Sequence, residues 1–341
     1  MMKILTLEST CDETAAAVVT DELQVLGSVV ASQDDLHRRF SGVVPEIAAR
    51  AHVENFLPVI DETLRRANVQ LSELDAIAVA NTPGLAGSLL VGLTAAKALC
   101  LATGKPLVAT NHLHAHIYAC RMAAGKNVFP CVGLIVSGGH TSLYHCASPS
   151  NFHYLGGTID DAAGEAFDKV ASMLGLSYPG GPAISKAAEM GNPKAHRFPR
   201  ALRNEEGGLN FSFSGVKTAV RYAICGPQQT DFSAVHLSEQ QIADLAASFQ
   251  EAVVDSLVAK SQLALEQTGE KTLCVGGGVA ANRCLRERLG KMAAEVNIEL
   301  HIAPPAMCTD NAVMGAIAFE RLKAGKVESL ALEAIPGLVR E

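Results

Sequence analysis

The chain has 341 residues, of which 48% are hydrophobic, and it carries a formal net charge of -7. This length allows two domains or one large one, and the hydrophobic content provides for a sizeable core. An acidic chain does not bind nucleic acid over its whole surface, so a nucleic-acid partner would need a local basic patch or a helper subunit.

The cysteines and apolar runs indicate a cytoplasmic protein. Nine cysteines occur without any Cys-x-x-Cys pair, which favours buried thiols in a reducing cytosol over a disulfide framework or a zinc knuckle. The first residues lead into a short strand and lack the pattern of a secretory signal. An uncharged run at 76–96 is interrupted by Asn-Thr-Pro-Gly at 81–84, so it predicts a strand, a turn and a buried helix and no membrane partner.

The first part of the chain predicts a three-strand meander. Apolar segments at 4–7, 15–19 and 25–30 are typical of strands, and a polar loop joins the first two. This loop contains Asp12 and Glu13, which could act as general bases or position a nucleophile. Acids that simply form a turn are an equally good interpretation.

Two helices are predicted after this meander. Pro45 stands where a first-turn proline belongs, and residues 46–66 carry apolar side chains at helical spacing. Residues 85–101 are apolar nearly all round, which indicates a buried helix.

A pair of histidines follows a predicted strand at 107–110. His112 and His116 lie one helical turn apart, which places their Cβ atoms on one face roughly 5–6 Å apart. That spacing suits two ligands of one transition metal. An isolated pair is more often incidental, but the position after a buried strand and the availability of Asp310 favour a metal site. His114 would point away from this face.

The second half repeats the meander. Strands are predicted at 132–136, 142–146 and 154–158, with the loop Ser-Gly-Gly-His-Thr at 137–141 between the first two. Its glycines would let backbone N–H groups approach an anion, so the loop could hold a phosphate. An ordinary glycine hairpin turn is the alternative. Because strand–helix alternation follows each meander, we predict an α/β protein of two similar lobes facing each other.

Three more helices are predicted, over 161–174, over 239–268 with Ser238 as its cap, and over 310–324. In the first of them Asp161, Glu165 and Asp168 would share one face. There they could bind ribose hydroxyls or a metal, or form a solvated surface.

A glycine-rich segment at 276–282 follows a predicted strand at 273–275 and formally satisfies Gly-x-Gly-x-x-Ala. A dinucleotide site is therefore one interpretation. The next strand, 298–302, ends without an acid that could hold a ribose. We favour a loop that lines an adenosine pocket, with Asn282 as a polar contact, and close strand–helix packing through glycine is a third interpretation.

Taken together, these motifs resemble those of the tRNA N6-adenosine threonylcarbamoyltransferase family (TsaD), once labelled O-sialoglycoprotein endopeptidase. The resemblance runs in order from residue 3 to about residue 325. The segments that carry it are 8–14, 42–46, 112–116, 137–141, 160–169, 178–182, 211–218, 277–283 and 309–311. The chain departs from the usual pattern at Thr82, His114 and Ala115, and none of these changes removes an expected ligand.

The resemblance implies the actin-like ATPase (ASKHA) fold, with two ribonuclease-H-like lobes around a nucleotide cleft. An N-terminal lobe would comprise residues 1–110 and 310–341, and a C-terminal lobe residues 111–309. It also implies transfer of the threonylcarbamoyl group of threonylcarbamoyl-AMP to N6 of the adenosine at position 37, beside the anticodon, in tRNAs that read codons starting with A. The transfer would be metal-assisted and would release AMP.

The resemblance further assigns roles to residues. His112, His116 and Asp310 would bind one divalent metal ion, Fe²⁺ or Zn²⁺, and Asp12 and Glu13 would lie near the reacting centre. An adenylate or ATP-type nucleotide would be held by the following residues: Ile135, Val136, Ser137, Gly138, Gly139, Asp168, Gly181 and Asn282. Expected partners are tRNA, a paralogous dimerising subunit (TsaB-like), a small P-loop ATPase (TsaE-like) and a synthase that makes the adenylate.

Three other functions compete with this interpretation. A metallopeptidase would need a water-activating carboxylate beside the histidines, but Leu113 occupies the place of glutamate in His-Glu-x-x-His. A non-enzymatic ATP-binding scaffold is suggested by the fold alone and would leave tRNA unmodified. A dinucleotide oxidoreductase would bind nicotinamide.

Overall fold

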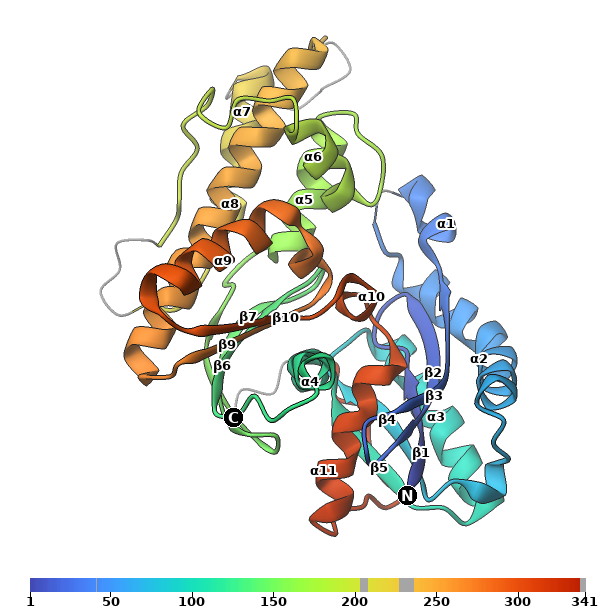
Figure 1. Ribbon diagram of the computed structural model, residues 1–341. Helices are drawn as coiled ribbons and strands as arrows, with labels where there is room; N and C mark the ends of the chain where they lie inside the picture. The colour runs from blue at the N-terminus through green and yellow to red at the C-terminus, as the bar shows by residue number, and fades with distance from the viewer. Residues whose placement is uncertain (41, 203–207, 227–235, 338–341) are drawn as a thin grey trace. The chain divides into compact units, whose positions relative to one another are not determined.

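The computed structural model describes residues 1–40, 42–202, 208–226 and 236–337 (Figure 1). The chain forms two compact units. The first comprises Met1–Asn127, Ser148–Phe152 and Thr309–Glu341, and the second Val128–Ala147 and His153–Cys308. The predicted N-terminal lobe ended at residue 110, whereas residues 111–127 group with the first unit because their helix packs on residues 312–317.

The first unit contains a five-stranded sheet in the order β3-β2-β1-β4-β5. The predicted meander is confirmed, since β1 pairs antiparallel with β2, and β2 with β3. Two parallel strands complete the sheet beside β1. The strands are β1 (Lys3–Glu8), β2 (Glu13–Thr20), β3 (Val25–Ser32), β4 (Ala76–Thr82) and β5 (Leu107–Asn111).

Two long helices, α2 (Pro45–Ala67) and α3 (Ala86–Thr103), cover one face of this sheet (Figure 1). Leu5 and Leu7 of β1 join Phe56 of α2 in their shared core. By length and composition α3 could span a membrane, but one such helix is weak evidence, because a core helix passes the same test. Three short helices flank the pair: α1 (Asp34–His37), η1 (Arg38–Phe40) and η2 (Leu71–Glu73).

The opposite face is covered by α4 (His112–Ala124), the 3₁₀ helix η4 (Ala312–Ile317) and α11 (Ala318–Lys323) (Figure 1). The predicted helix over 310–324 therefore begins two residues late and starts as a 3₁₀ turn. The Asn311 side chain caps it by accepting from the backbone N–H of Met314. A side chain at Gly315 would meet the Cβ of Thr6 at 2.9 Å, so the close approach to β1 requires glycine.

The second unit repeats the strand order of the first, which confirms the internal repeat predicted from the sequence. Its sheet runs β8-β7-β6-β9-β10, with β6 antiparallel to β7 and parallel to β9. The strands are β6 (Cys131–Val136), β7 (Thr141–Ser148), β8 (Asn151–Gly157), β9 (Thr272–Gly276) and β10 (Glu299–Ile302).

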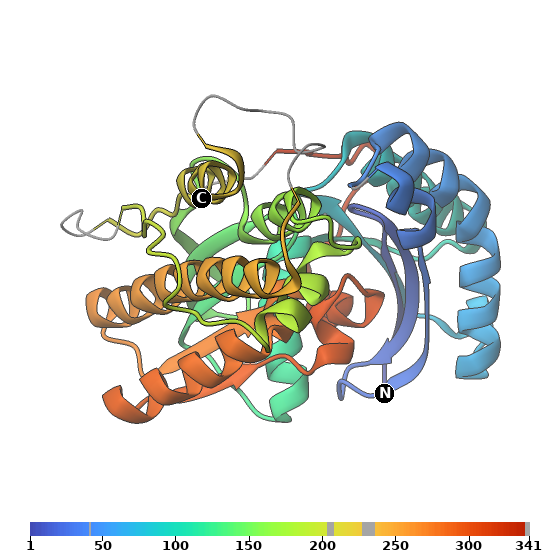
Figure 2. The same cartoon turned by 90° about the horizontal axis from the view of Figure 1, so that it is seen from above.

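Two helices, α8 (Glu239–Thr268) and α9 (Arg283–Val296), lie side by side on this second sheet (Figure 2). Ser238 caps α8 as predicted, because its hydroxyl accepts from the N–H of Gln241. The remaining helices are α5 (Ala163–Met173), α6 (Gly180–Ala188), α7 (Ser214–Cys225), η3 (Gly278–Ala281) and α10 (Pro305–Cys308).

Asp161 was predicted to share a helical face with Glu165 and Asp168. This prediction is wrong, because Asp161 lies outside the helix. Helix α5 begins only at Ala163, whose N–H donates to the hydroxyl of Thr141 at 2.9 Å. Ala162 is in an extended conformation, so the residues before Ala163 lie outside the helix. The Asp161 carboxylate instead pairs with the ammonium groups of two lysines, Lys169 and Lys217.

Close packing of α2 on β3 yields a stability prediction. A Cβ at Gly27 would lie 2.6 Å from the backbone N of Ala67 and 2.7 Å from the carbonyl O of Thr63. We expect Gly27→Ala to destabilise the protein by about 1–3 kcal/mol through overpacking, measured as a lower denaturant midpoint.

A matched control is Gly290→Ala on α9, where nothing lies within 4 Å of the added Cβ. Alanine favours a helix over glycine, so this variant should gain up to about 1 kcal/mol. Equal effects of the two substitutions would contradict the packing argument.

Candidate active site

The histidine pair is held by the junction of β5 and α4. The Asn111 side chain accepts from the N–H of Leu113 at 2.9 Å and of His114 at 3.3 Å, which starts the helix at His112. His112 and His116 therefore project from the first two turns, with ring centroids 4.7 Å apart. Both side chains are buried.

Asp310 joins these histidines from the other end of the chain. Its Oδ1 lies 3.2 Å from Nε2 of His116 and 3.5 Å from Nε2 of His112. One ligand atom from each of the three residues lies within 4.8 Å of the others. Ligand atoms about 2 Å from a common ion stand roughly 3–3.5 Å apart, so the observed separations suit a metal ion. The structure thus brings the three predicted ligands together.

Glu8 and Thr10 complete the surroundings of His112, a role that the sequence pattern did not indicate. Nδ1 of His112 lies 3.2 Å from Oε2 of Glu8 and 3.1 Å from the hydroxyl of Thr10. The other oxygen of Glu8 accepts from the N–H of Thr10 at 2.8 Å. A carboxylate that accepts from one imidazole nitrogen fixes the tautomer in which the other nitrogen can bind a metal.

A signal for Glu8 was present in the strand pattern. β1, β4 and β5 are parallel, so their carboxyl ends meet at one edge of the sheet. Glu8 ends β1, and His112 directly follows β5. The sequence places Glu8 and His112 at strand ends, but it does not show that these strands pair in parallel, which is why the contact was not predicted.

The charge around His112 favours a cation. Burial lowers the pKa of His112, but the carboxylates of Asp310 and Glu8 outweigh burial and raise this pKa to about 9. Nδ1 of His116 is buried and has no hydrogen-bond partner among the described residues, so the polar contact of its ring is the one to Asp310. Two imidazoles and a carboxylate, in a region that attracts positive charge, fit a divalent metal ion.

Two more acids lie near this cluster: Asp12 in the loop that leads into β2, and Glu13 as the first residue of that strand. Burial raises the pKa of Glu13 well above its ordinary value, and Asp310 and Asp12 raise it further. Asp12 is 8% exposed and hydrogen bonds with Glu13. The raised pKa means that the Glu13 carboxyl holds its proton more readily than an ordinary glutamate does.

His114, which lies between the two metal-site histidines, faces elsewhere as expected. Its ring stacks on Phe152, with centroids 4.0 Å apart and planes within 5°. Burial lowers the pKa of His114 to about 4. This histidine is therefore a neutral packing residue.

The glycine loop of the second unit has the features of an anion site. The Ser137 hydroxyl accepts from the N–H of His140 at 3.1 Å, and the carbonyl of Ser137 accepts from the N–H of Gly164 at 3.1 Å. Gly138 and Gly139 are exposed, and nothing in the described part of the chain accepts from their N–H groups. Two backbone donors therefore remain available for a phosphate.

Close glycine contacts gather the other predicted nucleotide-binding segments around this loop. Gly180 packs against Asp168, whose Oδ1 accepts from the Gly180 N–H at 2.7 Å, and Gly181 follows in the first turn of α6. Gly277 has a φ of +95° and packs directly against the carbonyl of Val136. The ends of β6 and β9 and the starts of α5 and α6 thus lie together in the second unit.

Several side chains in this group have structural contacts of their own. Ile135 and Val136 are wholly buried, so only their backbone could contact a ligand. Asn282 donates to Ser185 and to Gln250, at 2.8 Å each, and its oxygen caps α9. Contacts of these residues with an adenylate stay predictions.

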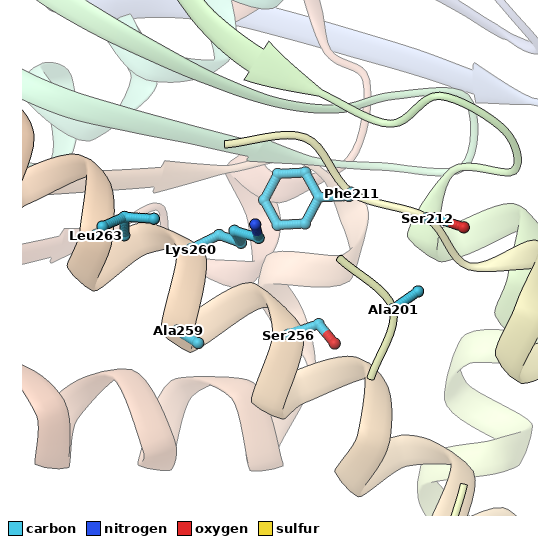
Figure 3. Close-up of a pocket in the computed structure, with 7 residues that line it drawn as sticks. All are labelled: Ala201, Phe211, Ser212, Ser256, Ala259, Lys260 and Leu263. Atoms are coloured by element: carbon cyan, nitrogen blue, oxygen red, sulfur yellow. The ribbon is translucent and has the colours of Figure 1, made fainter. Parts of the chain in front are cut away.

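A separate cavity in the second unit is too small for a nucleotide. It measures about 40 Å³, close to the space of one water molecule. Lys260 of α8 extends toward Phe211 there (Figure 3), and its ammonium donates to the backbone carbonyls of Leu202 and Gly208. The buried lysine thus ties α8 to the neighbouring loop. The lining residues are Ala201, Phe211, Ser212, Ser256, Ala259, Lys260 and Leu263.

Comparison with known proteins gives consistent sequence matches. A family model described as TsaD, tRNA N6-adenosine threonylcarbamoyltransferase, matches residues 24–317. A protein of that name from Rhodopirellula baltica is 56% identical over 348 residues, covering 99% of this chain and 97% of the relative. Another, from Symbiobacterium thermophilum, is 51% identical, covering 98% of this chain and 96% of the relative.

Solved structures show the fold. HypF from T. kodakarensis has a TM-score of 0.63 at 14% identity, covering 94% of this chain and 48% of HypF. Component A of the (R)-2-hydroxyglutaryl-CoA dehydratase from Acidaminococcus fermentans has a TM-score of 0.55 at 14% identity, covering 96% of this chain and 100% of the other. The chain therefore has the predicted actin-like ATPase fold.

The contacts of Glu8 generate a prediction about metal affinity. Glu8→Gln keeps the size of the side chain but leaves one oxygen for two donors and removes a negative charge. We expect the affinity for Fe²⁺ or Zn²⁺ to fall about 10–100-fold, measured by titration of the metal-free protein against a competing chelator.

The control is Glu73→Gln, which makes the same change at the Lys3 ion pair. It should leave metal affinity unchanged. Wild-type metal affinity in Glu8→Gln would show that Glu8 does not support the site.

Proposed function

The chain belongs to the tRNA N6-adenosine threonylcarbamoyltransferase family, and we propose that it performs this transfer with threonylcarbamoyl-AMP as the donor. The acceptor is N6 of the adenosine at position 37 in tRNAs that read codons starting with A. The observation that carries this proposal is similarity over nearly the whole chain. The convergence of His112, His116 and Asp310 supports it.

We assign the metal-binding role to His112, His116 and Asp310, with Fe²⁺ as the preferred ion and Zn²⁺ as the alternative. Two histidines and one carboxylate form the ligand set typical of non-haem Fe²⁺ sites, and Zn²⁺ also accepts three such ligands. These residues would hold the ion, which would supply a Lewis acid that polarises the carbonyl of the donor. The role of Glu8 is to hold His112 in the tautomer whose Nε2 faces Asp310.

The acids of the first loop would handle the proton of the acceptor. The N6 amine of adenine is a poor nucleophile because its lone pair is delocalised into the ring, so it must lose a proton as it attacks. We assign this removal to Asp12 or Glu13. The raised pKa of Glu13 supports the assignment, since a carboxyl of this kind exchanges protons closer to neutral pH than an ordinary one.

The second unit would hold the adenylate part of the donor. Negative charge develops on the leaving phosphate as the carbamoyl–phosphate bond breaks. The N–H groups of Gly138 and Gly139 are available to stabilise this charge. In this assignment the backbone at 135–139, Gly181, Asp168 and Asn282 contact the nucleotide. The side chains of Asp168 and Asn282 also hold the surrounding loops in place.

The net charge of the chain and its exposed apolar side chains support partner subunits. A chain with a net charge of -7 is poorly suited to hold tRNA alone. Val53 and Leu57 on α2, and Leu90 and Leu101 on α3, are more than half exposed, which favours a protein partner. We propose a paralogous TsaB-like subunit and a TsaE-like P-loop ATPase as partners, and a cytoplasmic location.

The acid pair gives a direct test of the mechanism. In the double variant Asp12→Asn/Glu13→Gln the proton acceptor is lost, so the transfer rate should fall about 10²–10⁴-fold. The measurement is formation of the modified nucleoside in tRNA, with the donor and all partner proteins supplied. Asp35→Asn, an exposed acid of the same unit, is the control. An unchanged rate in the double variant would remove the acid–base role.

The metal ligands are tested by elemental analysis. His112→Ala/His116→Ala should lose bound metal, whereas His114→Ala should keep it, because His114 stacks on Phe152 away from the cluster. Full metal occupancy in the double variant would reject the ligand assignment.

A further inference from the structure

A chain of buried polar side chains begins next to α2 in the first unit. The N–H of Val44 donates to Nδ1 of His37 at 3.3 Å, and Nε2 of His37 lies 3.2 Å from Oε1 of Gln33. The side chains of His37 and Gln33 are almost completely inaccessible to solvent. Val44 belongs to the segment Gly-Val-Val-Pro-Glu at 42–46, to which the proposed mechanism gives no role.

The same series of hydrogen bonds continues to the loop before β2, which leads to Asp12 and Glu13 and is called the acid loop below. Nε2 of Gln33 lies 3.4 Å from Nδ1 of His52, and Nε2 of His52 lies 3.0 Å from the carbonyl oxygen of Cys11. The hydroxyl of Thr14 lies 2.7 Å from Nδ1 of His52. His52 is on α2 and is fully buried. Four hydrogen-bonded steps therefore connect residue 44 with the backbone at residue 11.

Chemistry fixes the direction of each of these bonds. A carbonyl oxygen only accepts, so Nε2 of His52 carries the hydrogen, and its Nδ1 accepts from Thr14 and Gln33. A backbone N–H only donates, so Nδ1 of His37 accepts from Val44 and its Nε2 donates to Gln33. Both imidazoles are thus neutral and held in one tautomer. Burial, which lowers the pKa of His52, agrees with this state.

The last hydrogen bond of this series lies beside the proposed catalytic acids. The carbonyl of Cys11 accepts from His52 and also from the hydroxyl of Ser88, at 3.1 Å. Asp12 and Glu13 are the next two residues, so their backbone starts from this doubly held peptide group. Buried polar groups are costly unless all are paired, and an aliphatic side chain at position 52 would avoid that cost. The polar chain therefore orients the loop and does more than fill space.

We propose that His52 is a positioning residue for the transfer, which fixes the loop carrying Asp12 and Glu13 through its hydrogen bond to Cys11. Gln33 and His37 hold the imidazole of His52 and link it to the N–H of Val44. This inference rests on the proposed role of Asp12 and Glu13, and it gives the 42–46 segment a function.

The test compares two substitutions of His52 in the complete enzyme with its partners. His52→Leu removes the donor to Cys11 and keeps apolar volume, whereas the amide of His52→Gln can still donate to that carbonyl. We expect kcat of His52→Leu to fall about 10–100-fold through misplacement of the acids. Its KM for tRNA and its metal content should stay unchanged, and His52→Gln should recover most of the lost kcat.

Thr63→Val is the matched control on the same helix. Thr63 is equally buried, and its hydroxyl bonds to the carbonyls of Ala16 and Val59, away from the acid loop. This variant should lower the melting temperature without changing kcat. Gln33→Leu should lower kcat as well, and combining it with His52→Leu should cause no further loss, because both act through one hydrogen-bonded chain.

Two results would overturn the proposal: wild-type kcat in folded His52→Leu, or equal kcat in the Leu and Gln variants. If His52→Leu does not fold, the kcat of Gln33→Leu tests the proposal instead. A wild-type kcat in that variant overturns the proposal. Failure of the proposed function is a separate result, because an active Asp12→Asn/Glu13→Gln variant would exclude catalysis by the loop whatever His52 does.

Discussion

The approach of two buried imidazoles to the carboxylate of Asp310 is the constraint on which the first unit depends. Buried charges and unpaired imidazole nitrogens are costly in a protein interior unless each has a partner. Glu8 satisfies one nitrogen of His112, and Asp310 faces the other. A divalent ion would balance the negative charge that these carboxylates leave, so the folded geometry and the proposed chemistry have the same electrostatic origin.

Bringing Asp310 to this place requires close backbone packing far from the histidines in sequence. The hydroxyl of Thr6 donates to the carbonyl of Ala312 at 2.5 Å, and Gly315 lies against Thr6 where no side chain would fit. Threonine on the central strand and glycine on η4 therefore hold the last part of the chain against β1. Asp310 is positioned by this contact, and its own side chain contributes the charge.

The two units combine the same strand order with different residues in the turn after the first strand. In each, the turn after the first strand lies at the carboxyl end of a strand that has a parallel neighbour, where open α/β sheets commonly bind ligands. In the first unit this turn carries Asp12 and Glu13 and is held by His52. In the second unit it carries Gly138 and Gly139, whose small size leaves backbone donors accessible. Acids suit proton transfer, and glycine amides suit a phosphate.

The sequence by itself determined the meanders, most helices and the His112–His116 spacing, because local periodicity and turn residues act over a few positions. Together with the family resemblance it also indicated Asp310 and the loop at 137–141. Tertiary structure decided what depends on strand adjacency: Glu8 meets His112 because β1 and β5 end at one edge of the sheet. It likewise brought His52 to the acid loop and left Asp161 outside α5, since partners distant in sequence govern both.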